Sequence, residues 1–202
     1  MNYPDFFDAV PKISLYDPLA EFLGATEGGI LQYGYVDAVR LAGHSCPTVA
    51  SAYWSTCKAL AYLYPDAIPV RGDIRVEFGQ DSTSGVTGVI ANIVSMLTGA
   101  TFDTGFKGIA GRFDRRKRLF FSVEMSGEMR FTRIDTNRAV NVAANLQRVP
   151  ASPRLPMLMA NCVADTATKE ETAEFRELWQ ARVRSILLEH DDDPEVFVVT
   201  PV

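Results

Sequence analysis

The sequence predicts an α+β fold, in which a mixed or antiparallel sheet is flanked by helices and a long amphipathic helix lies near the C-terminus. Apolar residues recur at three- and four-residue spacing over residues 47–64 and 168–190, which is typical of helices with one buried face. Residues 69–79 alternate between apolar and polar, as a strand does. The two patterns do not alternate regularly, so a chain of βαβ units is not expected.

The composition limits what the protein can be. The chain has 202 residues, of which 47% are hydrophobic and 22% charged, so it can bury a substantial core within one domain. The net charge of −5 argues against nucleic acid or an anionic membrane as a partner. The three cysteines do not form a disulfide framework, and neither a secretory signal nor a membrane span is visible. We therefore expect a cytoplasmic protein.

The first 40 residues are interrupted by prolines and glycines, which suggests short helices joined by turns. One brief helix is predicted after Asp17, with Pro18 at its first position and Gly24 near its end. Residues 33–41 are compatible with either a helix or a strand.

The middle of the chain gives the clearest predictions. A helix begins at Pro47 and ends before Pro65, and a strand follows with Ile74, Val76 and Phe78 on one face. A polar turn leads to a second helix over 86–97. We then expect a loop rich in Thr and Gly over 98–108 and a solvated basic turn over 115–118. Paired strands are predicted over 119–124 and 129–134, followed by a helix over 137–146.

A break at residues 151–156 suggests a boundary between an α+β domain over 1–150, which carries the site, and a C-terminal helical extension over 151–202. Thr168 and Glu171 form a predicted capping box before the long amphipathic helix. The apolar face of this helix must pack on its own domain or on a dimer partner. The strand-like tail 196–199 could also pair across subunits.

The candidate site lies at the start of the first long helix. His44 and Cys46 are two residues apart, and Pro47 places Cys46 at the helix N-cap, because proline favours the first turn. The unpaired N–H groups and the dipole of the helix favour a thiolate there. A thiolate and an imidazole form a ligand pair suited to Zn²⁺ or another divalent transition metal.

Two ligands do not complete a zinc site, which needs three or four including water. Cys57 lies eleven residues after Cys46, about 16 Å along the helix, so it is predicted to be core packing. Glu77 and Asp81, near the end of the predicted strand, are the better sources of a third ligand. Cys162 is a weaker candidate.

Two kinds of site therefore remain open. One is a metal site that binds, and could transform, a small-molecule ligand. The other is a metal-free cysteine-dependent enzyme, with Cys46 as nucleophile and His44 as its base. The residues alone do not establish whether the protein is an enzyme.

The segment Gly43-His44-Ser45-Cys46-Pro47 resembles the Gly-His-x-Cys-Pro signature of the FmdE-like family, which is named after formylmethanofuran dehydrogenase. In that family a Thr-Gly-Cys-Thr segment, then Gly and Lys, follows a second helix. The segment Thr98-Gly99-Ala100-Thr101, with Gly105, Lys107 and Gly108 after it, occupies the corresponding place here. The resemblance implies that His44 and Cys46 form the metal-binding pair.

The chain departs from the family pattern at several positions. Thr48 replaces a usual glycine, Ala100 replaces a cysteine, and the turn at 82–84 lacks another cysteine. The C-terminal zinc ribbon found in many members is also missing. The resemblance thus implies a divergent, single-site member. It further implies a homodimer, and it raises the alternative of a non-catalytic accessory subunit of a molybdenum or tungsten oxidoreductase.

Overall fold

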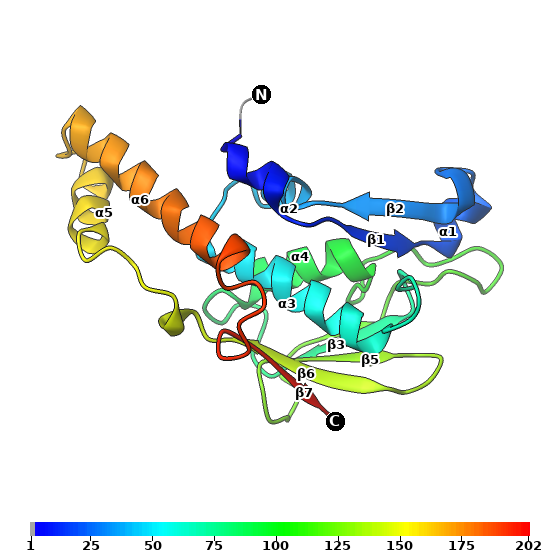
Figure 1. Ribbon diagram of the computed structural model, residues 1–202. Coiled ribbons are helices and arrows are strands. Elements are labelled where there is room, and N and C mark those ends of the chain that lie inside the picture. The colour runs from blue at the N-terminus through cyan, green and yellow to red at the C-terminus, as the bar shows by residue number, and fades with distance from the viewer. Residues whose placement is uncertain (1–2) are drawn as a thin grey trace.

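A five-stranded sheet forms one layer of the computed structural model, which describes residues 3–202 (Figure 1). The strands lie in the order β4-β3-β5-β6-β7, and only the β3–β4 pair is parallel. The predicted mixed sheet and the α+β class are therefore confirmed. The five strands are β3 (Ile74–Phe78), β4 (Leu119–Phe120), β5 (Met129–Arg133), β6 (Ala139–Ala144) and β7 (Phe197–Pro201).

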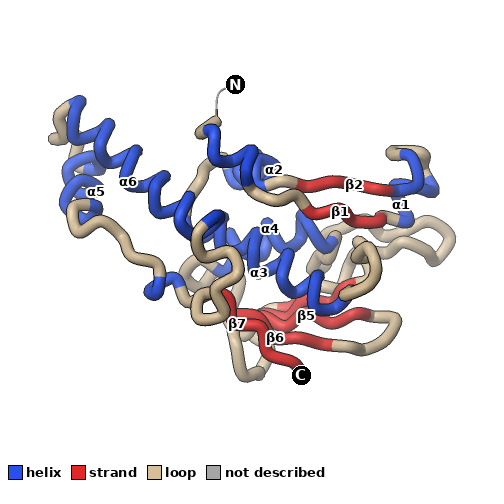
Figure 2. Tube along the Cα trace, in the orientation of Figure 1, coloured by secondary structure: helices blue, strands red, loops and turns tan. Residues whose placement is uncertain are grey.

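Helices α3 (Pro47–Leu63) and α4 (Thr87–Thr98) pack against one face of this sheet (Figures 1 and 2). Helix α3 is the centre of the core, because alanines at 50, 52 and 59 are buried and allow close approach by its neighbours. Alternate residues of the strands, including Val76, Phe131 and Val140, are buried beneath it. Both helices confirm the helical predictions for these segments.

A third layer lies on the other side of the helices from the sheet (Figure 1). It contains a two-stranded antiparallel hairpin of β1 (Ile13–Tyr16) and β2 (Ile30–Tyr33), joined through α1 (Pro18–Phe22). Asp17 caps α1 by accepting N–H bonds from Leu19 and Ala20, which confirms the predicted helix start. A short 3₁₀ turn, η1 (Asp5–Ala9), precedes the hairpin, a second, η2 (Glu27–Gly29), lies between α1 and β2, and α2 (Tyr35–Ala42) follows the hairpin.

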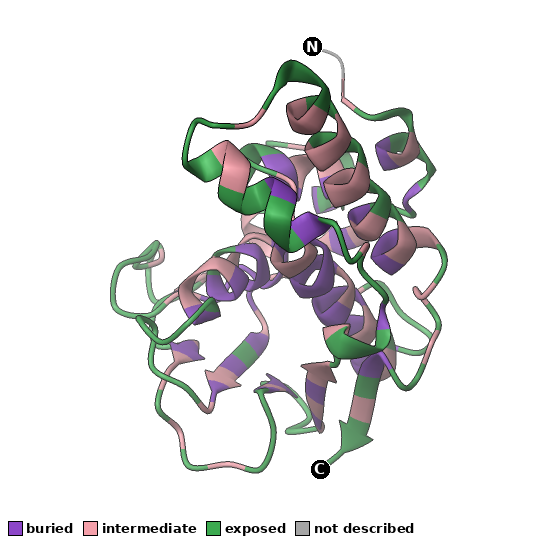
Figure 3. Cartoon of the chain, turned by 90° about the vertical axis from the view of Figure 1, so that its left-hand side faces the viewer, coloured by how far each residue is buried: buried purple, intermediate pink, exposed green. Residues whose placement is uncertain are grey.

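The C-terminal part leaves the sheet and returns to it. After β6 and the turn η3 (Leu146–Arg148), helices α5 (Leu155–Val163) and α6 (Lys169–Leu188) form a hairpin that projects from the body (Figure 1). The predicted capping box of Thr168 and Glu171 is present. Buried residues of α6 are confined to its last two turns, and the outer part of the hairpin is intermediate or exposed (Figure 3). Strand β7 then pairs with β6 of the same chain.

Three predictions for residues 115–146 were wrong. Residues 139–144 form strand β6 rather than a helix, because Val140 and Val142 are buried on one face with Asn141 between them. Strand β4 is short and pairs with β3 rather than β5, since Ser122, at a φ of 57°, turns the chain away. Arg115 is buried, whereas a solvated turn was expected there.

Within residues 3–202, none of the helices is both long enough and apolar enough to cross a membrane.

Candidate functional site

The loop between α2 and α3 carries the two candidate ligands. Helix α2 ends at Gly43, whose φ of 76° is the left-handed conformation that terminates many helices. Cys46 is the N-cap of α3 in an extended conformation, and its Sγ accepts the N–H of Val49 at 3.4 Å. Pro47 occupies the first helical position. The predicted position of the Cys46 sulfur at the helix N-terminus is thereby confirmed.

The His44 ring is exposed and is oriented by the backbone. Its Nδ1 lies 3.0 Å from the carbonyl oxygen of Ala42. Because a carbonyl oxygen only accepts, Nδ1 must carry a proton and donate it to this bond. In the neutral imidazole the lone pair is therefore on Nε2, which is the arrangement that metal-binding histidines commonly have.

Ser45, between the two candidate ligands, is held by three side chains. Its Oγ donates to Oε1 of Gln180 at 3.0 Å and accepts from the Tyr35 hydroxyl at 2.9 Å. Its carbonyl oxygen accepts the Trp179 Nε1–H at 3.0 Å. Burial raises the pKa of Tyr35, so this phenol remains protonated and can donate. Helices α2 and α6 together thus fix the loop.

These supporting residues were missed at the level of sequence. Gln180 and Trp179 lie 135 and 134 residues after Ser45 in the chain. Trp179 was interpreted only as part of the apolar face of the long helix, and no local pattern links either residue to the loop. Long-range contacts of this kind have no signal in a single sequence.

The other predicted ligands lie in separate places. Glu77 is on β3 and forms an ion pair with Arg75 at 3.2 Å, Asp81 accepts the N–H of Thr83 at 2.9 Å, and Cys162 is on α5. In the part of the chain that the structure describes, no three His, Cys, Asp or Glu side chains come together in a way that could hold a metal. The structure therefore does not bring a third ligand of these types to His44 and Cys46.

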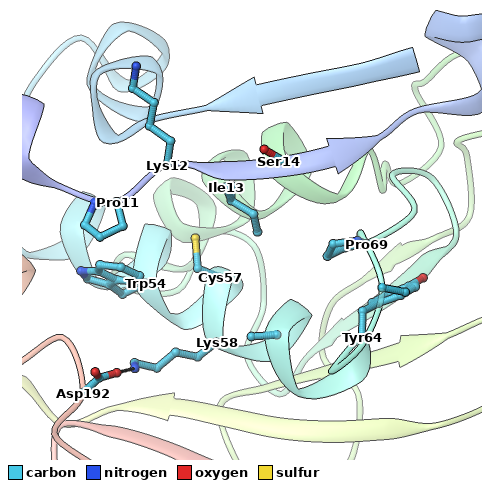
Figure 4. A pocket seen from close by; sticks show the side chains of 12 residues that line it. Pro11, Lys12, Ile13, Ser14, Trp54, Cys57, Lys58, Tyr64, Pro69 and Asp192 are labelled. Atoms are coloured by element: carbon cyan, nitrogen blue, oxygen red, sulfur yellow. Dashed lines mark hydrogen bonds and ion pairs between the residues drawn. The ribbon is translucent and has the colours of Figure 1, made fainter. Parts of the chain in front are cut away.

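Cys57 packs in the core, as predicted. It is buried on α3, and this burial raises its pKa to about 12. Its sulfur points toward β1 across a hollow of about 420 Å³ that α3 and β1 enclose (Figure 4). Lys58, on the rim of the same hollow, forms an ion pair with Asp192 at 3.0 Å.

A second hollow, of about 330 Å³, lies next to the loop that carries His44 and Cys46. Ser45 forms part of its wall, and aromatic side chains from η1 and α6 form much of the rest. These include Phe7, Phe175 and Trp179. Of the loop residues 44–46, Ser45 alone is part of this wall, and the hollow could receive the apolar part of a small molecule next to the loop.

The donor atoms available in this loop agree in type with a zinc site, but their number does not complete one. Nε2 of His44 and Sγ of Cys46 are among the ligands that zinc prefers. A tetrahedral site needs at least one more ligand besides water, and the described residues of one chain do not supply a third side chain of the usual types.

A comparison with curated proteins gives no match to the chain. A comparison with protein families gives a match to the family described as "FmdE, Molybdenum formylmethanofuran dehydrogenase operon", over residues 41–194. The matched range begins just before the His44 and Cys46 loop and extends beyond α6. Because this range includes most of the chain and the whole candidate site, the predicted resemblance is confirmed, and the chain belongs to the FmdE family.

Proposed function

We propose that the protein binds a divalent transition metal, with zinc the favoured ion, through Nε2 of His44 and Sγ of Cys46. The observation that carries this proposal is the hydrogen bond from His44 Nδ1 to the carbonyl oxygen of Ala42. It directs the free lone pair of the ring to Nε2, and it orients an exposed side chain that would otherwise rotate freely.

The surroundings of Cys46 support the same proposal. The N–H of Val49 and the positive end of the α3 dipole favour a negative sulfur, which is the form that binds metals. Trp179 and Gln180 hold the Ser45 between the two ligands, so that both donors are presented from a fixed loop. Fixed ligands lose less conformational entropy when they bind.

The remaining coordination positions would be filled from outside the chain, by water, by a small-molecule ligand or by a side chain of a second copy. When bound, the metal would supply a Lewis acid beside the hollow at Ser45. The residues of the chain would orient the apolar part of a ligand in that hollow and partly exclude water from it.

Metal analysis of untagged protein, purified without chelator, tests the proposal. We expect about one zinc per one or two chains, and we expect H44A and C46S each to lose most of it. H190A and C162S are the matched controls, because they remove the other histidine and the other partly exposed cysteine. Stoichiometric zinc that persists in the H44A/C46S double variant would refute the assignment.

The second candidate function is a metal-free cysteine-dependent reaction at Cys46. It is favoured by one observation, which is that among the described residues no group of three His, Cys, Asp or Glu side chains could hold a metal. In that case the purified protein contains no zinc and does not bind added zinc. The C46S variant would then abolish a covalent reaction with an electrophilic probe, while H44A would slow it.

A further inference from the structure

A buried ion-pair cluster lies beside α1, at the end of the β1–β2 hairpin away from α2 (Figure 1). Asp17 accepts a hydrogen bond from Arg71 at 2.8 Å and another from Arg115 at 2.6 Å. The Asp17 and Arg115 side chains are only 4% and 7% exposed. Two guanidinium groups therefore share a single buried carboxylate, which leaves positive charge in excess.

The buried guanidinium of Arg115 has a donor that is not used. Its Nη1 is buried and has no hydrogen-bond partner among residues 3–202. This nitrogen lies against Gly72, where an added Cβ would meet it at 1.4 Å. Gly99, at the end of α4, leaves further room, since a Cβ there would lie 2.9 Å from the same atom. Both glycines thus make space for a buried charge whose hydrogen bonds are incomplete, which is rare without a functional reason.

A hollow of about 300 Å³ opens at this cluster. Its wall contains Arg71, Gly72 and Arg115, together with Asp73, Phe113 and Arg118. Arg118 is half-buried and makes no hydrogen bond or ion pair through its side chain within the described chain, and Nη2 of Arg71 is also unused. Burial, and then the charge of Asp135, raise the pKa of Asp73. Asp73 is therefore a weaker acid than an ordinary exposed aspartate.

We propose that this hollow binds the phosphate group of a small molecule. Three guanidinium groups face one hollow, with the carboxyls of Asp17 and Asp73 as their nearby counter-charges. Guanidinium groups bind phosphate through paired N–H donors, and a phosphate has enough free oxygens to accept from three arginines at once. A carboxylate ligand has only two oxygens and one negative charge, so it matches three arginines less well than a phosphate does. Asp17 already supplies one carboxylate to Arg71 and Arg115.

The arginines of the basic run 115–118 do not all lie in the same surroundings. Arg115 and Arg118 face the hollow, whereas Arg116 is partly exposed and forms an ion pair with Asp114 at 2.7 Å. The run is therefore not a uniform solvated turn. It supplies two arginines to the hollow and leaves a third beside them as an internal reference for a test.

The test is a calorimetric titration of the full chain with inorganic phosphate, and with acetate at the same ionic strength. We expect saturable binding of phosphate and at least tenfold weaker binding of acetate. R118Q should weaken phosphate binding at least tenfold, and R116Q should leave it unchanged within a factor of two. The two variants remove the same charge from the same run, so their difference measures position rather than net charge.

Thermal unfolding of both variants would check that they fold, and in the described chain the Arg118 side chain has no hydrogen-bond or ion-pair partner whose loss would destabilise the protein. Phosphate that binds without saturation would overturn the proposal, and so would equal weakening by R116Q and R118Q. Acetate that binds as tightly as phosphate would also overturn it, in favour of a carboxylate ligand.

Discussion

At the scale of single residues, burial makes Cys57 less reactive than the two partly exposed cysteines, Cys46 and Cys162. Cys57 is buried with a pKa of about 12, and only a thiolate reacts quickly with an alkylating reagent. We predict that iodoacetamide at about pH 8, near the ordinary pKa of a thiol, labels Cys46 in the metal-free native protein and spares Cys57. Peptide mass spectrometry would measure this, with urea-unfolded protein as the control in which all three cysteines react. Equal labelling of Cys46 and Cys57 in the native state would contradict the buried position.

Asp17 gives a second prediction at the residue scale. Burial pushes the pKa of this carboxyl upward, but the hydrogen bond from Arg71 and the charge of Arg115 outweigh it, so the pKa lies below its ordinary value. The unfolded chain then binds the proton first as the pH falls. The stabilisation is present above about pH 4, the ordinary range of the group, and is lost as the pH falls through the lower folded pKa.

The substitution D17N tests this, because asparagine can still cap α1 but has no charge. We expect the free energy of unfolding at neutral pH to fall by about 3 kcal/mol, the usual cost of breaking a buried ion pair. Urea unfolding at several pH values would measure it, and the acid-induced loss of stability should be smaller in D17N. D114N is the matched control, because its ion pair with Arg116 is exposed, and it should change stability little.

The sequence predicted single residues well where the reason was local. Pro47 restricts the backbone at its own position, so the N-cap position of Cys46 followed directly. The burial of Arg115 could not be predicted, because it depends on Gly72, Gly99 and Asp17 meeting from distant parts of the chain. A run of basic residues is usually exposed to solvent, and only contacts with distant parts of the chain can bury one of its members.

At the scale of elements, α6 supports the loop at the start of α3. W179F replaces the indole with a smaller aromatic ring and removes the N–H that Trp179 donates to the Ser45 carbonyl. If His44 and Cys46 bind zinc, we expect about tenfold weaker affinity, because groups that orient the ligands contribute at this level. A competition titration with a chromogenic chelator would measure the affinity.

W54F is the matched control for this prediction. Trp54 also donates its Nε1–H to a backbone carbonyl at 3.0 Å, but the acceptor is Leu187, away from the loop. The two variants should lose similar stability, about 1 kcal/mol each, and only W179F should weaken zinc binding. Equal zinc affinities in the two variants would mean that α6 does not support the site.

The elements themselves differed in how far they could be predicted. Helices α3, α4 and α6 have long apolar periods and clear caps, and all three were predicted near their observed ends. Strand β6 lies within the segment 137–146 that was predicted as a helix, and of its residues only the alanines favour a helix strongly. Burial against α3, which alternates along the segment, decided in favour of the strand.

At the scale of the whole molecule, the α5–α6 hairpin projects from the body and exposes apolar residues (Figure 1). Met157 and Met159 are exposed on α5, and Val163 is 80% exposed. A surface of this kind is typical of an interface. We predict that the full chain sediments as a homodimer, and that M157E/V163E shifts it toward the monomer.

I68E is the control for the homodimer prediction, because Ile68 is an exposed apolar residue on another surface. It should leave the sedimentation coefficient unchanged. A monomer at all accessible concentrations would refute the homodimer. A dimer that M157E/V163E does not weaken would place the interface away from the hairpin.

The class of the fold could be predicted for the whole molecule, but the connectivity of the sheet could not. Strand β6 pairs with β5 on one side and with β7, more than fifty residues later, on the other. Pairing across such a distance depends on the packing of α3 against the strands and of α6 against α3, and no local pattern records it.

The return of the chain from α6 to β7 has a consequence for proteolysis. The α5–α6 hairpin leaves the sheet after β6 and re-enters it at β7, so both ends of this excursion are bound to the same sheet. A protease that cuts the exposed part of the segment 150–154 would break the chain but not these contacts. Five residue pairs between β6 and β7, together with the buried Phe197 and Ile186, would hold the fragments together. We expect the nicked protein to elute from a sizing column as one species and to separate only in denaturant, so that it behaves as a two-fragment complementation system.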